Sequence, residues 1–103
     1  MAQTPEGKVK DAVKKVLQDR GAYYFMPATG GYGRSGVADI VACYRGCFVA
    51  IECKAEGNEA TALQLREQRA VHAAKGISMV LIGLAQIRVL QNVLDLIDLQ
   101  KGI

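Results

Sequence analysis

Histidine is almost absent from this 103-residue chain, in which His72 is the only one. Active sites of the HNH and HExxH types each need more than one histidine, so the sequence excludes both. No serine or cysteine has a histidine partner in a recognisable motif, which disfavours nucleophilic catalysis of the Ser–His or Cys–His kind. For His72 itself we expect a surface or packing role on a helix.

Cysteines are few, and long apolar runs are missing. The cysteines lack the CxxC and Cys/His spacings of zinc sites, and their strand-like surroundings predict buried thiols at Cys43, Cys47 and Cys53. No apolar run reaches the roughly 18 residues that a membrane span needs, and no signal peptide precedes the first predicted helix. We therefore expect a cytoplasmic protein with no membrane partner.

Composition favours one small domain. Hydrophobic residues make up 50% of the chain and charged residues 22%. At this length such a content fits a single domain spanning 1–103, whose core needs no disulfide or structural metal. The formal net charge of +3 permits a nucleic-acid partner without requiring one.

Local signals predict seven helices and strands. The first helix begins at a cap formed by Thr4 and Pro5, and the second begins at a capping box formed by Thr61 and Gln64. The order helix–strand–strand–strand–helix–strand–helix predicts an α/β fold with a mixed β-sheet flanked by helices. The expected helices are 5–20, 62–75 and 84–97, and the expected strands are 22–28, the two arms of a hairpin within 38–55, and 77–82.

The hairpin segment "ADIVACYRGCFVAIECKA" (38–55) carries charged residues among residues that suit a core. Its two apolar arms flank Arg45 and Gly46, a link typical of a tight turn. With this link Asp39 directly faces Glu52, and Lys54 shares the face of Glu52 because strand side chains alternate. Opposed carboxylates repel, so without a cation we expect removal of Asp39 to stabilise the protein by about 0.2–1 kcal/mol.

A bound cation would explain the opposed acids. Two carboxylates at this separation can both reach one Mg²⁺ or Mn²⁺ ion, which prefers oxygen ligands. Lys54 would then lie within reach of whatever the metal binds. The alternative is that Lys54 neutralises one acid while Asp39 caps the entry to its strand. We favour the metal site, because aspartate is depleted in strands and surface ion pairs seldom need three charges at one strand end.

Three segments carry a resemblance to a known family. "GVADI" (36–40) and "VAIECKA" (49–55) resemble the signature of the PD-(D/E)XK nuclease superfamily, and with "TALQLREQ" (61–68) the chain is most similar to the VRR-NUC (virus-type replication-repair nuclease) branch. The resemblance implies a restriction-endonuclease-like core and a Mg²⁺- or Mn²⁺-dependent endonuclease acting on DNA. Small members of this branch resemble phage and bacterial enzymes that cut branched DNA such as Holliday junctions, so we expect that substrate and a bacterial or phage-infected cell.

The resemblance also implies roles for individual residues. Asp39 and Glu52 would bind the metal, the backbone carbonyl of Cys53 would complete its shell, and Lys54 would act on the phosphate or the attacking water. Glu6, on the first helix, would be an additional catalytic acid and metal ligand. A favourable position at the positive end of the helix dipole explains Glu6 equally well.

Four further residues are expected near the DNA. Gln64 and Gln68 match the Gln-x₃-Gln of the family and would steady the catalytic lysine or contact DNA, although the capping box alone explains Gln64. In the loop "GYGRSG" (31–36), the glycines would let the backbone approach a phosphate that Arg34 or Ser35 contacts. We exclude a nucleotide cofactor, because the G-x-G-x-x-G pattern in this loop leads into a strand and not into a helix.

Two other functions are compatible with the fold, and the assembly state is a separate prediction. The chain could be a non-catalytic DNA-binding module, or a restriction-type or RNA-directed nuclease. The last helix, 84–97, has apolar residues around most of its circumference, which predicts a homodimer. The alternative to the dimer is a monomer whose C-terminal tail covers the helix.

Overall fold

The chain folds in the predicted order of helices and strands, which the computed structural model describes for residues 3–28 and 34–102. The first strand is shorter than expected, and the last helix begins one 3₁₀ turn later and ends at Gln100. The elements are α1 (Pro5–Asp19), β1 (Tyr23–Phe25), β2 (Ile40–Tyr44), β3 (Cys47–Lys54), α2 (Ala62–Ala73), β4 (Ile77–Ile82), the 3₁₀ turn η1 (Leu84–Gln86) and α3 (Ile87–Gln100).

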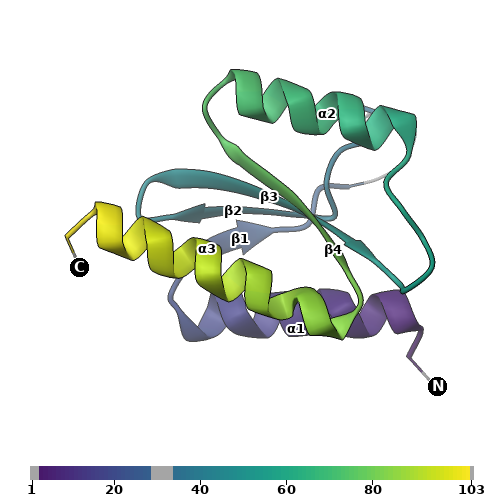
Figure 1. Ribbon diagram of the computed structural model, residues 1–103, viewed down its shortest axis with the longest axis horizontal. Coiled ribbons are helices and arrows are strands. Elements are labelled where there is room, and N and C mark those ends of the chain that lie inside the picture. The colour runs from purple at the N-terminus through teal and green to yellow at the C-terminus, as the bar shows by residue number, and fades with distance from the viewer. Residues whose placement is uncertain (1–2, 29–33, 103) are drawn as a thin grey trace.

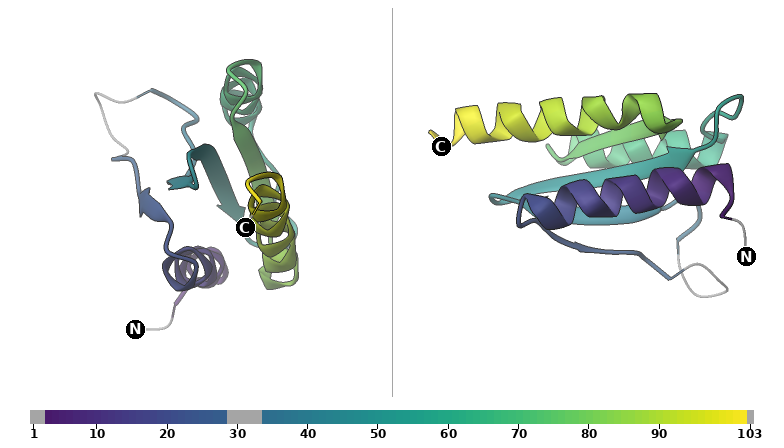
Figure 2. Two further views of the ribbon diagram at one scale, coloured as in Figure 1. Left: turned by 90° about the vertical axis from the view of Figure 1, so that its left-hand side faces the viewer. Right: turned by 90° about the horizontal axis from the view of Figure 1, so that it is seen from below.

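A four-stranded mixed sheet in the order β1-β2-β3-β4 forms the centre of the molecule. The first three strands are antiparallel and β4 runs parallel to β3, so the chain crosses over through α2 to reach β4. Helices α1 and α3 lie side by side on one face of the sheet, and α2 lies on the other (Figures 1 and 2). We call these the inner and the outer face.

The hydrophobic core lies between the inner face and the pair α1 and α3. Strand alternation sends Ile40, Ile51 and Leu81 to the inner face, where each is fully buried. The two helices close this core with one apolar stripe each, and the buried stripe residues are Val9, Val13, Val16 and Leu17 of α1 and Leu90, Leu94 and Ile97 of α3.

Arg45 occupies a position of the hairpin turn that usually favours glycine. Arg45 and Gly46 have φ values of 51° and 84°, as a two-residue turn with two left-handed positions requires. The Arg45 Nε donates to Asp98 Oδ1 at 2.7 Å, and its guanidinium lies over the ring of Tyr44. These contacts offset the left-handed backbone strain of a non-glycine residue.

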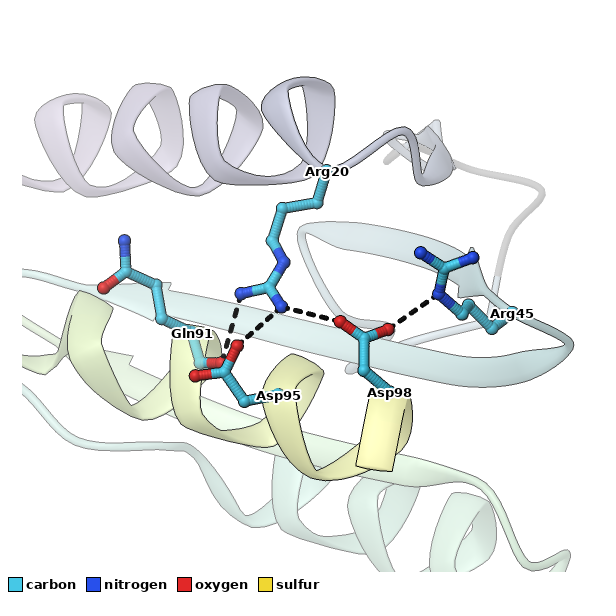
Figure 3. A network of polar contacts seen from close by, with 5 residues as sticks. All are labelled: Arg20, Arg45, Gln91, Asp95 and Asp98. Atoms are coloured by element: carbon cyan, nitrogen blue, oxygen red, sulfur yellow. Dashed lines mark hydrogen bonds and ion pairs between the residues drawn. The ribbon is translucent and has the colours of Figure 1, made fainter. Parts of the chain in front are cut away.

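Asp98 also joins the turn to α1 (Figure 3). Its second oxygen accepts from Arg20 at 3.0 Å, while Arg20 also donates to Asp95 at 2.6 Å and to the Gln91 carbonyl at 3.4 Å. Arg20 is the cap residue at the end of α1. One carboxylate therefore links the end of α1, the β2–β3 turn and the last turn of α3.

Helix α2 packs more loosely than the other two helices. Its predicted capping box is confirmed at Thr61 and Gln64, but none of its residues is buried. It contacts the sheet through Gln68 and His72, whose side-chain nitrogens lie 3.4 and 3.2 Å from the carbonyl oxygen of Ser78. A cleft therefore remains between α2 and the outer face.

Helix α3 has two apolar faces with different surroundings. Leu90, Leu94 and Ile97 are buried, whereas Val89, Leu96 and Leu99 are 45%, 61% and 74% exposed. The exposed residues follow one another at helical spacing and form a stripe that we call the outer stripe of α3. In the part of the chain that the structure describes, no helix is both long enough and apolar enough to cross a membrane.

Candidate active site

The candidate site is at the open end of the hairpin, where the predicted register is confirmed. Tyr44 pairs with Cys47, Ala42 with Val49 and Ile40 with Ile51. The next pair in this register is Asp39 and Glu52. Asp39 comes just before β2, and its Oδ2 accepts the backbone N–H of Cys53 at 2.8 Å. This hydrogen bond holds the carboxylate of Asp39 against the end of β3.

Glu52 is the buried acid of the pair. It is 6% exposed, and its Oε2 has no hydrogen-bond partner among the described residues. Burial raises the pKa of Glu52 to about 8, and the hydrogen bond to Asp39 and the charge of Asp39 act in the same direction. Lys54 opposes this shift without cancelling it. An unpartnered buried carboxylate oxygen beside a second carboxylate is a donor set that suits a hard cation.

Lys54 lies two residues beyond Glu52 on the same outer face of β3. Its side chain is half-buried, and within residues 3–28 and 34–102 it forms no salt bridge with a carboxylate. Its charge nevertheless acts to lower the pKa of Glu52, so Lys54 is close enough to act on the acids electrostatically. The ammonium remains free to approach a phosphate.

A residue that the sequence prediction missed also lies at this site. Lys10 Nζ is 3.2 Å from Glu6 Oε2 and 3.6 Å from Asp39 Oδ1. Partial burial disfavours its charge, but the hydrogen bond to Glu6 and the charge of Asp39 outweigh that effect and raise the pKa of Lys10. The Glu6–Lys10 pair could be predicted from its i,i+4 spacing in the sequence. The contact between Lys10 and Asp39 could not, because it depends on how α1 packs on the sheet.

Glu6 lies beside Lys10, which separates it from Asp39. Glu6 lies in the first turn of α1, as both of its predicted interpretations require, and its carboxylate pairs with Lys10. Among the described residues, no three or more His, Cys, Asp or Glu side chains gather closely enough to hold a metal ion. In this structure the donor set is the opposed pair Asp39 and Glu52, with Lys10 between Asp39 and Glu6.

The side chain of Cys53 points away from the acids into the core, as predicted. It is fully buried, and burial raises the pKa of its thiol to about 12, with the charges of Asp39 and Glu52 adding to the shift. The thiol is therefore neutral, and only the backbone of Cys53 can serve the site. Of the other cysteines, Cys47 is partly buried and Cys43 is exposed, so the prediction that Cys43 is buried is wrong.

The four residues expected near DNA lie around α2. Gln64 Oε1 accepts the Thr61 backbone N–H at 2.8 Å, so its side chain acts as a cap. Gln68 donates to Ser78 O, and Arg34 pairs with Glu67 of α2 at 2.7 Å while remaining 72% exposed. Ser35 is exposed. Residues 31–33 of the glycine-rich loop lie outside the described residues.

A cleft of about 930 Å³ is lined by three of these residues, Arg34, Gln64 and Gln68, and by Glu52 of the acidic pair, whereas Asp39 and Lys54 do not line it. It lies between α2 and the outer face, with Val41, Phe48 and Ala50 on its floor and Val71 on its wall. Its polar lining includes Glu52, Gln64, Gln68 and Glu67. A ligand in the cleft would therefore meet both an apolar floor and carboxylates.

This architecture is an α/β fold, with a mixed four-stranded sheet, α1 and α3 on one face, α2 on the other and acids at the open end of the hairpin. A solved structure titled "VRR_NUC domain" has the same fold, with a TM-score of 0.74 over 87% of this chain and 97% of that chain, at 24% sequence identity. This likeness confirms the predicted fold. No family model matches the sequence, and no curated protein matches it.

Proposed function

We propose that this protein is a metal-dependent endonuclease that hydrolyses phosphodiester bonds in DNA. The observation that carries the proposal is the opposed pair Asp39 and Glu52, in which a buried oxygen of Glu52 has no hydrogen-bond partner among the described residues. A buried carboxylate oxygen without a partner costs about 1–3 kcal/mol, and a bound metal ion would offset this cost. The fold that the chain shares with a VRR_NUC domain supports the same function.

The donor chemistry suits Mg²⁺ or Mn²⁺, held by Asp39 and Glu52, with the carbonyl of Cys53 as the further donor that the family resemblance implies. When bound, such a metal polarises the scissile phosphate and lowers the pKa of a bound water. The hydrogen bond from the Cys53 N–H keeps Asp39 in place for this role. Lys54 stabilises the negative charge that grows on the phosphate oxygens.

Exposed aromatic rings next to the acids support a branched DNA substrate. Tyr23 and Phe25 of β1 are 69% and 49% exposed, and their ring centroids are 6.4 Å apart. Phe25 pairs with Val41, which lies on the outer face two residues after Asp39, so Phe25 is on this face too. Unpaired bases stack on exposed aromatic rings, and branched substrates with single-stranded parts, such as forks and flaps, offer such bases.

The outer stripe of α3 supports a homodimer. Val89, Leu96 and Leu99 together expose an apolar surface that a second copy would cover. A two-fold pair would carry two copies of the acidic site, which suits symmetric cutting of a four-way junction.

A cleavage assay on branched and linear DNA, with Mg²⁺, Mn²⁺ or EDTA, tests the proposal. We expect cleavage only with metal, a preference for branched substrates, and a loss of at least about 100-fold in Asp39→Ala, Glu52→Gln and Lys54→Met. Asp19→Asn, which removes an exposed acid elsewhere on α1, should retain full activity.

Three outcomes would contradict parts of this proposal. Cleavage that persists in EDTA or in Asp39→Ala would exclude the metal mechanism. DNA binding without cleavage under every metal condition would favour the non-catalytic module. Equal cutting of linear duplex would remove the preference for branches and indicate a restriction-type nuclease.

A further inference from the structure

Lys10 connects two carboxylates that the sequence separates widely. It is 3.2 Å from Glu6 on its own helix and 3.6 Å from Asp39 at the start of β2. The side chains of Lys10 and Asp39 are only 33% and 21% exposed, so solvent screens this contact less than it would screen a surface pair. The ammonium group thus lies against one proposed metal ligand and against the acid that could serve a second metal.

The geometry sets an ammonium group and a second metal ion in competition for the same oxygens. A divalent cation shared by Glu6 and Asp39 would bind their oxygens at about 2.0–2.2 Å. Lys10 Nζ already lies within ion-pair distance of one oxygen from each residue. Two cations cannot share this place, because like charges at such a separation repel strongly.

The charges around the site favour one divalent metal ion over two. Glu6, Asp39 and Glu52 supply three carboxylates, and Lys10 and Lys54 supply two ammonium groups. One divalent cation leaves a small positive excess that a bound phosphate neutralises. A second divalent cation would leave a strongly positive, partly buried site.

We propose that Lys10 is a built-in cation that occupies the place between Glu6 and Asp39 and limits the site to one divalent metal ion. This inference rests on the proposed function, since it assumes that Asp39 and Glu52 bind a metal. Glu6 then acts on Lys10 and not on a metal. Lys10 is a positioning residue, because it acts through Asp39.

Counting bound Mn²⁺ tests this inference without relying on activity. Free Mn²⁺ is followed by electron paramagnetic resonance during titration of the full chain. We expect one bound ion in the wild type and two in Lys10→Met and in Lys10→Gln. Lys10→Arg keeps the positive charge and should bind one. The matched control is Lys15→Met, which removes another i,i+4 ion pair of the same helix, with Asp19 at 2.8 Å, and should also bind one.

A double variant identifies the second position. If Glu6 becomes a ligand once Lys10 is removed, then Lys10→Met combined with Glu6→Gln should bind one ion again. Circular dichroism of each variant verifies that the fold is intact. If Lys10→Met does not fold, Lys10→Gln, whose amide can still bond to both acids, makes the same test.

The possible results separate this inference from the proposed function. Two ions in the wild type, or one ion in both folded neutral variants, would overturn the role of Lys10 while metal-dependent cleavage could still stand. No bound Mn²⁺ in any variant, together with cleavage in EDTA, would overturn both. Two ions in the Lys15→Met control would show that loss of any helix charge is sufficient, and would also overturn the specific role of Lys10.

Discussion

Glu52 is a carboxylic acid on the outer face of β3 that has lost most of its contact with water. Its pKa of about 8 arises chiefly from burial and secondarily from Asp39. In the metal-free protein it therefore holds a proton near neutral pH, which also removes the repulsion between the two opposed acids. A metal ion would displace this proton, so metal binding and proton release are linked at this site.

The raised pKa predicts that the metal-free protein loses stability as the pH rises. Between about 4.5 and about 8, Glu52 binds a proton in the folded state but not in the unfolded state. Its contribution to the free energy of unfolding is therefore fully present below about 4.5 and is lost as the pH rises through about 8. Glu52→Gln should lack this decline and should melt at a higher temperature than the wild type at pH 8.

Thermal melting in EDTA at a series of pH values checks this prediction. The difference between wild type and Glu52→Gln isolates Glu52 from other titrating groups. A difference that stays constant from pH 5 to pH 8 would contradict the buried, protonated acid. Adding Mg²⁺ or Mn²⁺ should reverse the order at pH 8, because only the wild type gains the metal.

Substitution of Asp39 is less suitable for a stability test. From the sequence we predicted that its removal would relieve the repulsion between the two opposed carboxylates. Asp39 accepts the Cys53 N–H and contacts Lys10, and neither contact was foreseen. Truncation to alanine would leave a part-buried donor without a partner, at a cost of about 1–3 kcal/mol. This exceeds the about 0.2–1 kcal/mol of relief expected from the opposed charges.

At the scale of elements, Gly36 determines how closely the β2 segment approaches α2. It has a φ of 81°, and a Cβ at this position would lie 2.4 Å from Leu63 O and 2.9 Å from Gln64 N. Both are backbone atoms of the first turn of α2, so they cannot move aside as a side chain would. The close approach fixes one end of a helix that has no buried residue of its own.

Gly36→Ala should therefore be strongly destabilising. The added methyl group collides with the α2 backbone at a cost of about 1–3 kcal/mol, and the left-handed backbone adds about 1–2 kcal/mol. Gly57→Ala is the matched control, because Gly57 has a φ of 89° and nothing within 4 Å of the added methyl group. Urea unfolding should show a larger loss for Gly36→Ala, and equal losses would contradict the contact with α2.

At the scale of the whole molecule, the two apolar faces of α3 have different surroundings, so substitutions on the two faces test different properties. Leu90 and Leu94 are buried in the core, so charged substitutions there would unfold the chain and reveal nothing about a dimer. The outer stripe of α3 is available to a partner. Leu96 and Leu99 are its most exposed members.

We predict that wild-type protein at micromolar concentration has twice the 11.1 kDa mass of one chain. Leu96→Glu combined with Leu99→Glu should give a folded monomer, because two charges cannot be buried in an apolar interface. Leu65→Glu on α2, at a residue 42% exposed, should leave the dimer intact. Light scattering measures all three masses. A monomeric wild type would refute the dimer, and a double variant that stays dimeric would exclude this surface.

The sequence by itself determined the features that depend on neighbouring residues. The cap at Thr4, the capping box at Thr61 and the pairing of Tyr44 with Cys47 follow from hydrogen bonds and alternation over a few positions. For this reason the order of elements and the opposed position of Asp39 and Glu52 could be predicted.

Only the tertiary structure decided the features that depend on which surfaces meet. Whether Glu52 loses water, whether Lys10 reaches Asp39 and which face of α3 is covered depend on how α1, α2 and α3 pack on the sheet. The apolar residues around α3 could not reveal which of them face the core, because a helix with two apolar faces permits either orientation. Burial and long-range charge contacts arise between elements distant in the chain, and local patterns carry no information about their distances.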